Sequence, residues 1–217
     1  MACHYFSKAM PTDTVHRRQR LPAEIRISQI LDAALAEFSQ HGFKAARMED
    51  IAQAASLSKG GLYAHFPSKE SLLKTLLQRV VEEPLHDSLH WWPQGVQSLD
   101  ALVSAFVDHT IDRLMDPALL PTLRLLLAEA PRLPAEIQDW HAKMMQLHYD
   151  NHERLIQRAV TEGLLKQAPD AVDCTILMLP MMHTVLMILA SGKAITPAQL
   201  EALRPQNKML LMRLLRT

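Results

Sequence analysis

The 217-residue sequence has few of the residues that mark secreted, disulfide-linked or β-rich proteins. Its two cysteines, Cys3 and Cys174, are far apart and indicate no disulfide framework, which is typical of a reducing compartment. The first residues, MACHYFSKAM, contain no apolar run of the kind found in a secretory signal. Only 6 residues are glycine, and no segment alternates apolar and polar residues between turns. We therefore expect an all-α, cytoplasmic protein.

The chain also lacks an apolar run long enough to cross a membrane. Its most apolar stretch, CTILMLPMMHTVLMILA at residues 174–190, is shorter than the roughly 20 residues that a membrane span needs, and it contains Pro180 and His183. We interpret this stretch as a helix buried between the core of the domain and a partner subunit. We expect no membrane partner.

The common motifs of enzymes are missing as well. We find no glycine-rich phosphate loop, no GxSxG, no HExxH and no recognisable pair of catalytic carboxylates. His148 and His152 have the i, i+4 spacing that can share a metal, but no cysteine or carboxylate completes a ligand set. We interpret this pair as a solvated or hydrogen-bonded helix face. The sequence thus predicts no catalytic residue, no metal site and no cofactor.

What the sequence does contain is a pair of short amphipathic segments within residues 48–66, MEDIAQAASLSKGGLYAHF. Ile51 and Ala55 give the first segment an apolar stripe, and Leu62 and Phe66 repeat the stripe in the second. The small alanines of the first segment allow a second helix to cross closely. This pattern predicts a helix-turn-helix.

Two adjacent glycines open the second of these helices. Ser58 is a good N-cap, and Gly60 and Gly61 follow it in the first turn. Each glycine costs roughly 1 kcal/mol relative to alanine in a helix interior. Two adjacent glycines are expected at this position if the backbone must approach another molecule closely, and DNA is the usual partner of such a helix.

Charge is distributed unevenly along the chain. Residues 1–81 hold 11 Lys and Arg against 7 Asp and Glu, a net charge of +4, whereas residues 82–217 hold 12 against 16, a net charge of −4. We divide the chain into an arm at 1–21, a DNA-binding domain at 22–83 and a second helical domain at 84–217. The basic run HRRQR in the arm is either a DNA contact or a solvated leader.

Helical periodicity and end signals predict about nine helices. The first begins at Pro22 and ends at Gly42, and the fourth begins at Ser68 and extends to about residue 83. In the second domain we expect helices at 99–115, 117–130, 135–162, 170–190 and 197–215.

Residues 26–81, above all ILDAALAEFSQHGF and MEDIAQAASLSKGGLYAHFPSKESLL, closely resemble the DNA-binding domain of the TetR/AcrR family of transcriptional regulators. The resemblance implies that one set of residues faces DNA: Arg47, Met48, Ser58, Lys59, Gly60, Gly61, Tyr63, Ala64, His65 and Lys69. Two positions depart from the family pattern. Ser56 replaces a frequent turn glycine, and Arg47-Met48 replaces a frequent capping threonine, so we expect mild strain and a missing cap.

In this family the second domain typically holds a ligand pocket, and its last two long helices form a dimer interface. The aromatic, methionine and histidine residues of the predicted helices supply our candidates for the pocket: Phe106, Trp140, Met144, His148, Met182 and His183.

The resulting hypothesis is a DNA-binding transcriptional regulator of the repressor type that is not an enzyme. It would bind a near-palindromic operator in double-stranded DNA as a homodimer, and a small, mostly apolar effector would release it. The alternative is a helical ligand-binding or protein-interaction module whose DNA binding is lost or secondary.

Overall fold

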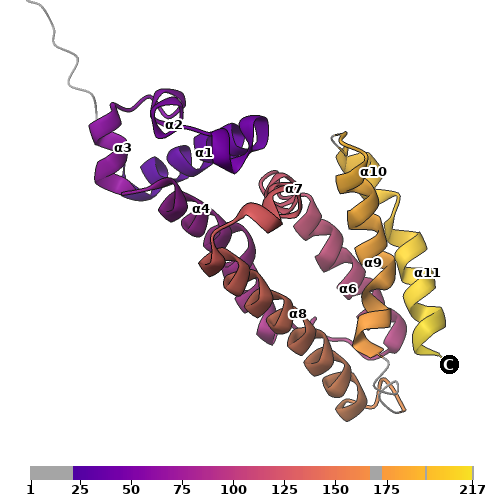
Figure 1. Cartoon of the computed structure of the whole chain (residues 1–217). Coiled ribbons are helices and arrows are strands. Elements are labelled where there is room, and N and C mark those ends of the chain that lie inside the picture. The colour runs from indigo at the N-terminus through magenta and orange to yellow at the C-terminus, as the bar shows by residue number, and fades with distance from the viewer. Residues whose placement is uncertain (1–21, 167–172, 194, 217) are drawn as a thin grey trace, which may run out of the picture.

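The structure, a computed structural model, describes residues 22–166, 173–193 and 195–216, and this part of the chain is helical without any strand (Figure 1). The predicted arm at 1–21 lies outside the described residues. The chain forms a head (α1 to α4) and a body (α5 to α11). The helices are α1 (Ala23–Ala45), α2 (Met48–Ala54), α3 (Lys59–His65), α4 (Lys69–Leu77), α5 (Glu83–Asp87), α6 (Leu99–Leu114), α7 (Leu119–Glu129), α8 (Ala135–Thr161), α9 (Asp173–Ala190), α10 (Pro197–Glu201) and α11 (Arg204–Leu215).

Capping side chains fix the short helices of the head. The Ser58 hydroxyl accepts a hydrogen bond from the backbone N–H of Gly61 at 3.1 Å, as predicted for an N-cap. Ser68 and Ser71 form a reciprocal capping box at the start of α4. Gly42 has φ 76° and ends the regular part of α1, after which one further turn leads to Ala45.

The turn between α2 and α3 carries the expected strain. Ser56 has φ 56° and is the one non-glycine residue with positive φ in the described part of the chain. Arg47 occupies the N-cap of α2 without a side-chain capping bond, which confirms the expected missing cap.

Head and body are joined by continuous helix. We predicted that the fourth helix ends near residue 83, but a π-helical turn (Gln78–Glu82) leads directly into α5. Pro84 has no N–H for the carbonyl of Val80 one turn earlier, and Arg113 of α6 donates to that carbonyl instead (Nη2 to O, 3.3 Å). The prediction failed because this compensating donor comes from a distant segment.

Most helices of the body agree with the predicted ranges, and Gly163, which follows the C-cap Glu162 of α8, has φ 73°. The predicted helix at 197–215 is instead divided into α10 and α11. Pro205 lies in the first turn of α11 and cannot continue the hydrogen bonding of α10. Residues 170–172 of the predicted helix at 170–190 lie outside the described residues.

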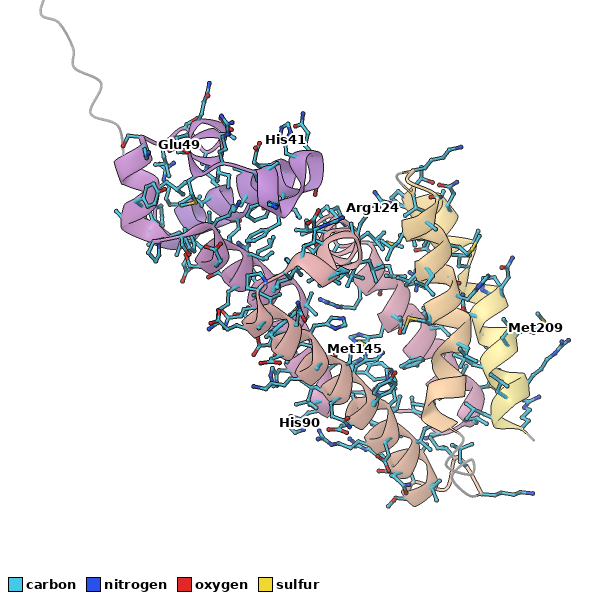
Figure 2. The ribbon with its side chains drawn as sticks, in the orientation of Figure 1. His41, Glu49, His90, Arg124, Met145 and Met209 are labelled. Atoms are coloured by element: carbon cyan, nitrogen blue, oxygen red, sulfur yellow. The ribbon has the colours of Figure 1, made fainter. Side chains whose placement is uncertain are left out.

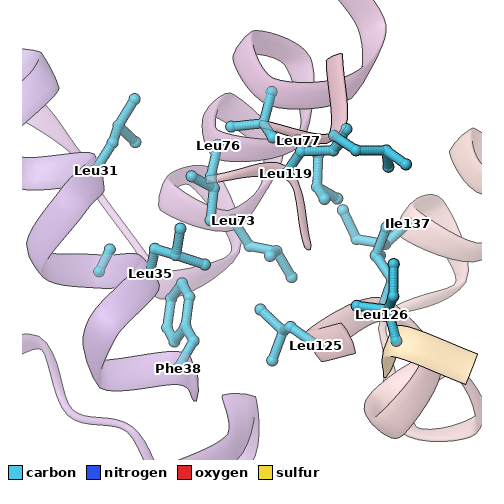
Figure 3. Close-up of a cluster of buried hydrophobic side chains, with 14 of the residues drawn as sticks. Leu31, Leu35, Phe38, Leu73, Leu76, Leu77, Leu119, Leu125, Leu126 and Ile137 are labelled. Carbon is cyan, nitrogen blue, oxygen red and sulfur yellow. The ribbon is translucent and has the colours of Figure 1, made fainter. Parts of the chain in front are cut away.

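One hydrophobic core extends through the head and the body. Figure 3 shows side chains of α1 and α4, such as Phe38 and Leu73, next to Leu125 of α7 and close to Ile137 of α8. All four are buried. The head therefore packs against α7 through apolar side chains, while α9 and α11 lie on the side of the body away from the head (Figure 1). Among the described helices, none is both long and apolar enough to cross a membrane.

Candidate nucleic-acid interface

The outer face of α3 presents a cluster of predicted DNA contacts to solvent. Lys59, Gly60, Tyr63, Ala64 and His65 are all exposed, and Tyr63 keeps 41% of its accessible surface. The opposite face carries Leu62, which is completely buried against the core of the head. Helix α3 is therefore held in place by its apolar face. Its outer face carries small side chains or none, except at Lys59, Tyr63 and His65.

Gly60 and Gly61 have different surroundings. A Cβ atom built on Gly60 would meet no atom within 4 Å. A Cβ atom on Gly61 would lie 3.2 Å from Oγ of Ser58, the atom that caps the helix. Packing against the N-cap thus accounts for Gly61, whereas the protein alone provides no reason for Gly60.

Lys59 pairs with Glu49 of α2 across the helix-turn-helix. The Lys59 Nζ lies 2.5 Å from Oε1 of Glu49, and the two side chains are 61% and 52% exposed. The hydrogen bond from Lys59, followed by backbone hydrogen bonding and the lysine charge, lowers the pKa of Glu49. The same hydrogen bond raises the pKa of Lys59. Lys59 also lies 6.0 Å from the centroid of the Tyr63 ring.

Met48 does not belong to this surface, and its assignment as a DNA contact was wrong. The side chain is 7% exposed and is part of the hydrophobic core. Met48 is the first residue of α2, and this helix turns its apolar side chains toward α1. Arg47, its neighbour, is exposed and stays a predicted DNA contact.

Lys69 has an internal role that the sequence did not reveal. Its ammonium group donates hydrogen bonds to the carbonyls of Lys44 at 3.0 Å and Ala46 at 3.1 Å, and it lies 4.9 Å from the centroid of the Phe43 ring. These bonds tie the start of α4 to the end of α1. An ammonium group has three donors, so one remains for a DNA phosphate, and this contact stays a prediction.

In the body, three aromatic side chains meet between α6 and α8. Phe106 packs edge-on against His152 with ring centroids 5.8 Å apart, and the His148 ring lies 4.3 Å from that of His152. Phe106 and His148 were among the residues that we predicted to line a ligand pocket, whereas His152 was not. The sequence showed its i, i+4 spacing from His148, but we interpreted the two histidines as part of a solvated or hydrogen-bonded helix face.

His152 is 9% exposed, and its Nδ1 forms no hydrogen bond of good geometry among the described residues. Burial, followed by the adjacent His148, lowers the pKa of His152 to about 3, and the backbone carbonyl of His148 opposes this fall only in part. Burial also lowers the pKa of His148. Both imidazoles are therefore neutral at pH 7.

A small apolar cavity adjoins this cluster. It encloses about 40 Å³ and is lined by side chains of α6, α8 and α11 together with Leu165. Among them are Phe106, Ala159 and Leu211. An apolar cavity of about 150 Å³ can hold benzene, so this cavity has to expand before it accepts a molecule of that size.

The other pocket candidates lie elsewhere. Trp140 donates a hydrogen bond from Nε1 to Oε2 of Glu82 at 2.7 Å and so connects α8 to the head–body junction. Met144 is half-buried on α8. Met182 and His183 are exposed on α9 in the single chain and do not line the small cavity, so their roles as pocket residues stay predictions. Periodicity cannot assign a face to a helix that is apolar on all sides.

Helices α9 and α11 expose apolar side chains on the side of the body away from the head. On α9, Leu179, Leu186 and Met187 keep 55%, 47% and 58% of their accessible surface. On α11, Met209 and Leu210 keep 48% and 41%. Such clustering of large apolar side chains is typical of a protein interface.

The head meets the body where α1 faces α7. A Cβ atom on Gly42 would lie 2.9 Å from Oε1 of Glu129, so the end of α1 packs directly on the end of α7. An open groove of about 920 Å³ runs between the two helices, and Arg124 of α7 is one of its polar residues. Figure 2 labels Arg124 on α7 and His41 and Glu49 on the head, and the guanidinium of Arg124 donates to the carbonyl of Ile188 on α9 at 3.5 Å.

Comparison with known proteins agrees with this architecture. Residues 30–76 match the family model described as bacterial regulatory proteins, tetR family. The HTH-type transcriptional regulator YfiR of Bacillus subtilis is 29% identical over 142 residues, which is 64% of this chain and 67% of YfiR. The transcriptional activator FasR of Mycolicibacterium smegmatis is 39% identical over 101 residues, which is 45% of this chain and 46% of FasR. The matches thus span from about half to two thirds of these relatives.

The crystal structure of a TetR family transcriptional regulator from Pseudomonas syringae pv. tomato covers most of both chains. It is 25% identical, with a TM-score of 0.66, over 87% of this chain and 95% of that one. The matched segment of the family model spans most of α1 through α4, the same helices that build the exposed face of α3. Residues 30–76 therefore match the tetR family of bacterial regulatory proteins, and the chain as a whole is similar in fold to a TetR family transcriptional regulator.

Proposed function

We propose that the protein is a dimeric DNA-binding transcriptional regulator of the repressor type whose DNA binding is released by a small apolar effector. The observation that carries the proposal is Gly60. This residue lies on an exposed helix surface where an alanine would meet nothing within 4 Å, so the absent side chain serves an external contact. In a helix-turn-helix that contact is DNA, and α3 enters the major groove.

The flanking side chains support the same orientation of the head. Tyr63, three residues after Gly60 and so on a neighbouring part of the α3 surface, and His65, further round the helix, are both exposed, and each can contact a phosphate or a base edge. We expect the protein to bind a duplex that contains the sequence upstream of its own coding region. Changing Tyr63→Ala should weaken this binding at least tenfold, which corresponds to about 1.4 kcal/mol.

The matched control for that variant is Tyr149→Ala. Tyr149 is 37% exposed on α8, in the body, and its loss should leave DNA binding unchanged. A fluorescence anisotropy titration of all three proteins measures the difference. Equal affinity of wild type and Tyr63→Ala would show that this face of α3 does not meet DNA.

We propose that the exposed apolar side chains of α9 and α11 form the homodimer interface. Two heads joined in this way would reach successive major grooves, about 34 Å apart along the duplex. Leu186→Glu places a charge in the middle of this surface and should shift the protein toward monomer in sedimentation equilibrium. Tyr149→Glu, on α8, is the control and should remain dimeric.

The apolar cavity beside Phe106 is our proposed effector site. Its lining offers apolar contacts, which favour a neutral, mostly apolar ligand. A ligand that binds only after the cavity expands must shift α6, α8 or α11, and its preference for the expanded state sets how far the population moves. Compounds that raise the unfolding temperature should therefore also weaken DNA binding.

A substitution that fills the cavity tests this assignment. Ala159 is completely buried in the lining, so Ala159→Val should reduce the effect of such compounds on both unfolding and DNA binding. Ala101→Val, at an exposed position of α6, is the control. If both variants respond to the compounds as wild type does, the effector binds elsewhere.

A transcription assay decides between repression and activation. With the upstream region as template, a repressor lowers the amount of transcript, and an apolar effector restores it. A higher amount of transcript upon addition of the protein would overturn the repressor assignment while leaving DNA binding intact.

A further inference from the structure

We propose that Glu49 is an intramolecular competitor of DNA phosphate: it occupies the Lys59 ammonium group in free protein and thereby lowers the affinity of the head for any duplex. The inference rests on the proposed function, because it concerns the surface that we expect to meet DNA. It goes further by assigning a regulatory role to an acidic residue that makes no attractive contact with a phosphate.

Geometry supports a direct competition. The carboxylate of Glu49 already holds Lys59 at 2.5 Å, and both groups are more than half exposed on the surface that carries Gly60 and Tyr63. Arg47, another predicted phosphate contact, also acts on the Glu49 carboxylate through its charge. Glu49 thus offsets positive charge at the place where phosphate contacts need it.

Glu49 opposes DNA binding in two ways. When Lys59 turns to a phosphate, the pair with Glu49 is broken. The freed carboxylate then lies near the negatively charged backbone of the duplex, where like charges repel each other. Both effects are electrostatic and independent of base sequence, so they act on every duplex.

The chain offers a close control for a change of charge at this site. Asp50 follows Glu49 in the first turn of α2, is exposed, and forms no ion pair within the described ranges 22–166, 173–193 and 195–216. Glu49→Gln and Asp50→Asn remove the same charge from nearly the same place. Only the first releases Lys59.

The experiment measures affinity for a labelled duplex of about 30 base pairs and arbitrary sequence, long enough for two heads one helical turn apart. We expect Glu49→Gln to bind roughly three- to tenfold more tightly than wild type at about 50 mM salt, and the gain to shrink at about 200 mM. Asp50→Asn should increase affinity distinctly less than Glu49→Gln does.

A double-mutant cycle shows whether Glu49 acts through Lys59. In the Lys59→Gln background, Glu49→Gln should lose most of its effect, because the cation that it releases is absent. Melting curves of all variants show that the head stays folded. The inference is overturned if Glu49→Gln and Asp50→Asn change affinity equally, or if the full gain persists without Lys59.

Failure of the proposed function would look different. In that case neither the wild type nor any variant would bind the duplex, even at low salt. A wild type that binds the duplex and a Glu49→Gln variant that binds it no more tightly would instead refute the competition alone.

Discussion

Replacing Gly60 by alanine should change protein stability and DNA affinity in opposite directions. Gly60 is the second residue of α3, and its φ is not positive, so alanine fits the backbone. The new methyl group would meet nothing within 4 Å, so it adds no steric cost in free protein. The substitution reduces the freedom of the unfolded chain and should stabilise the protein by about 0.4–1 kcal/mol.

For a chain of this length that gain raises the unfolding temperature by roughly 1–4 °C. On DNA the same methyl group lies between the α3 backbone and the duplex, so α3 must move outward and lengthen its contacts with phosphates and base edges. We expect at least a tenfold loss of affinity, or about 1.4 kcal/mol. Thermal melting followed by circular dichroism, and anisotropy titration with the upstream duplex, measure the two quantities.

Gln157→Ala is the matched control for the gain in helix propensity. Gln157 is exposed on α8, far from the head, and alanine there should also stabilise the protein slightly without changing DNA affinity. A Gly60→Ala variant that is more stable and binds DNA as tightly as wild type would refute the close approach of the backbone. The central argument for the function would then be lost.

Three further predictions test the packing of the head on the body and the packing within the body. Gly42→Ala should destabilise the protein by at least about 1–2 kcal/mol, because φ is 76° and the new Cβ would meet Glu129. In urea unfolding, the added substitution Glu129→Ala should restore only the part of the lost stability that the contact with Glu129 causes. The free energy of unfolding should fall as the pH drops below about 6.5, by up to about 1.4 kcal/mol per pH unit. The reason is that the unfolded chain binds a proton at His152 in this range, whereas the folded protein, in which the pKa of His152 is about 3, does not. His152→Leu should flatten this slope. Arg204→Leu should cost about 1–2 kcal/mol, since Arg204 joins α11 to α6 by ion pairs with Asp108 and Asp112, and the loss should be smaller at high salt.

The helices of the head could be predicted from sequence because their signals are local. The cap at Ser58, the capping box at Ser68 and the end of α1 at Gly42 each depend on residues within one turn. The positive φ of Ser56 has a different source, because the family resemblance, in which a turn glycine is frequent at this position, led us to expect strain there. Local chemistry therefore located the helix-turn-helix and the exposed face of α3.

In the body, the burial of individual side chains could not be predicted where it depends on which helices pack together. His148 and His152 look alike in sequence, but the packing of α6 against α8 buries His152 against Phe106. The methionines and His183 in the apolar helix α9 show no period that separates an inner from an outer face. Its inner face is set by contacts with α7, α8 and α11, segments that are distant in sequence.

Lys69 shows the same limit at a predicted DNA contact. Its place in the motif indicated a phosphate contact, and nothing nearby in sequence indicated that its ammonium group would reach the carbonyls of Lys44 and Ala46. These carbonyls face α4 only because the chain turns at Gly42 and brings the end of α1 across the start of α4. A lysine that binds a phosphate with its third donor while keeping these two bonds would hold α1 and α4 fixed against the duplex. The position of α3 in the groove then depends on a hydrogen bond between segments more than twenty residues apart.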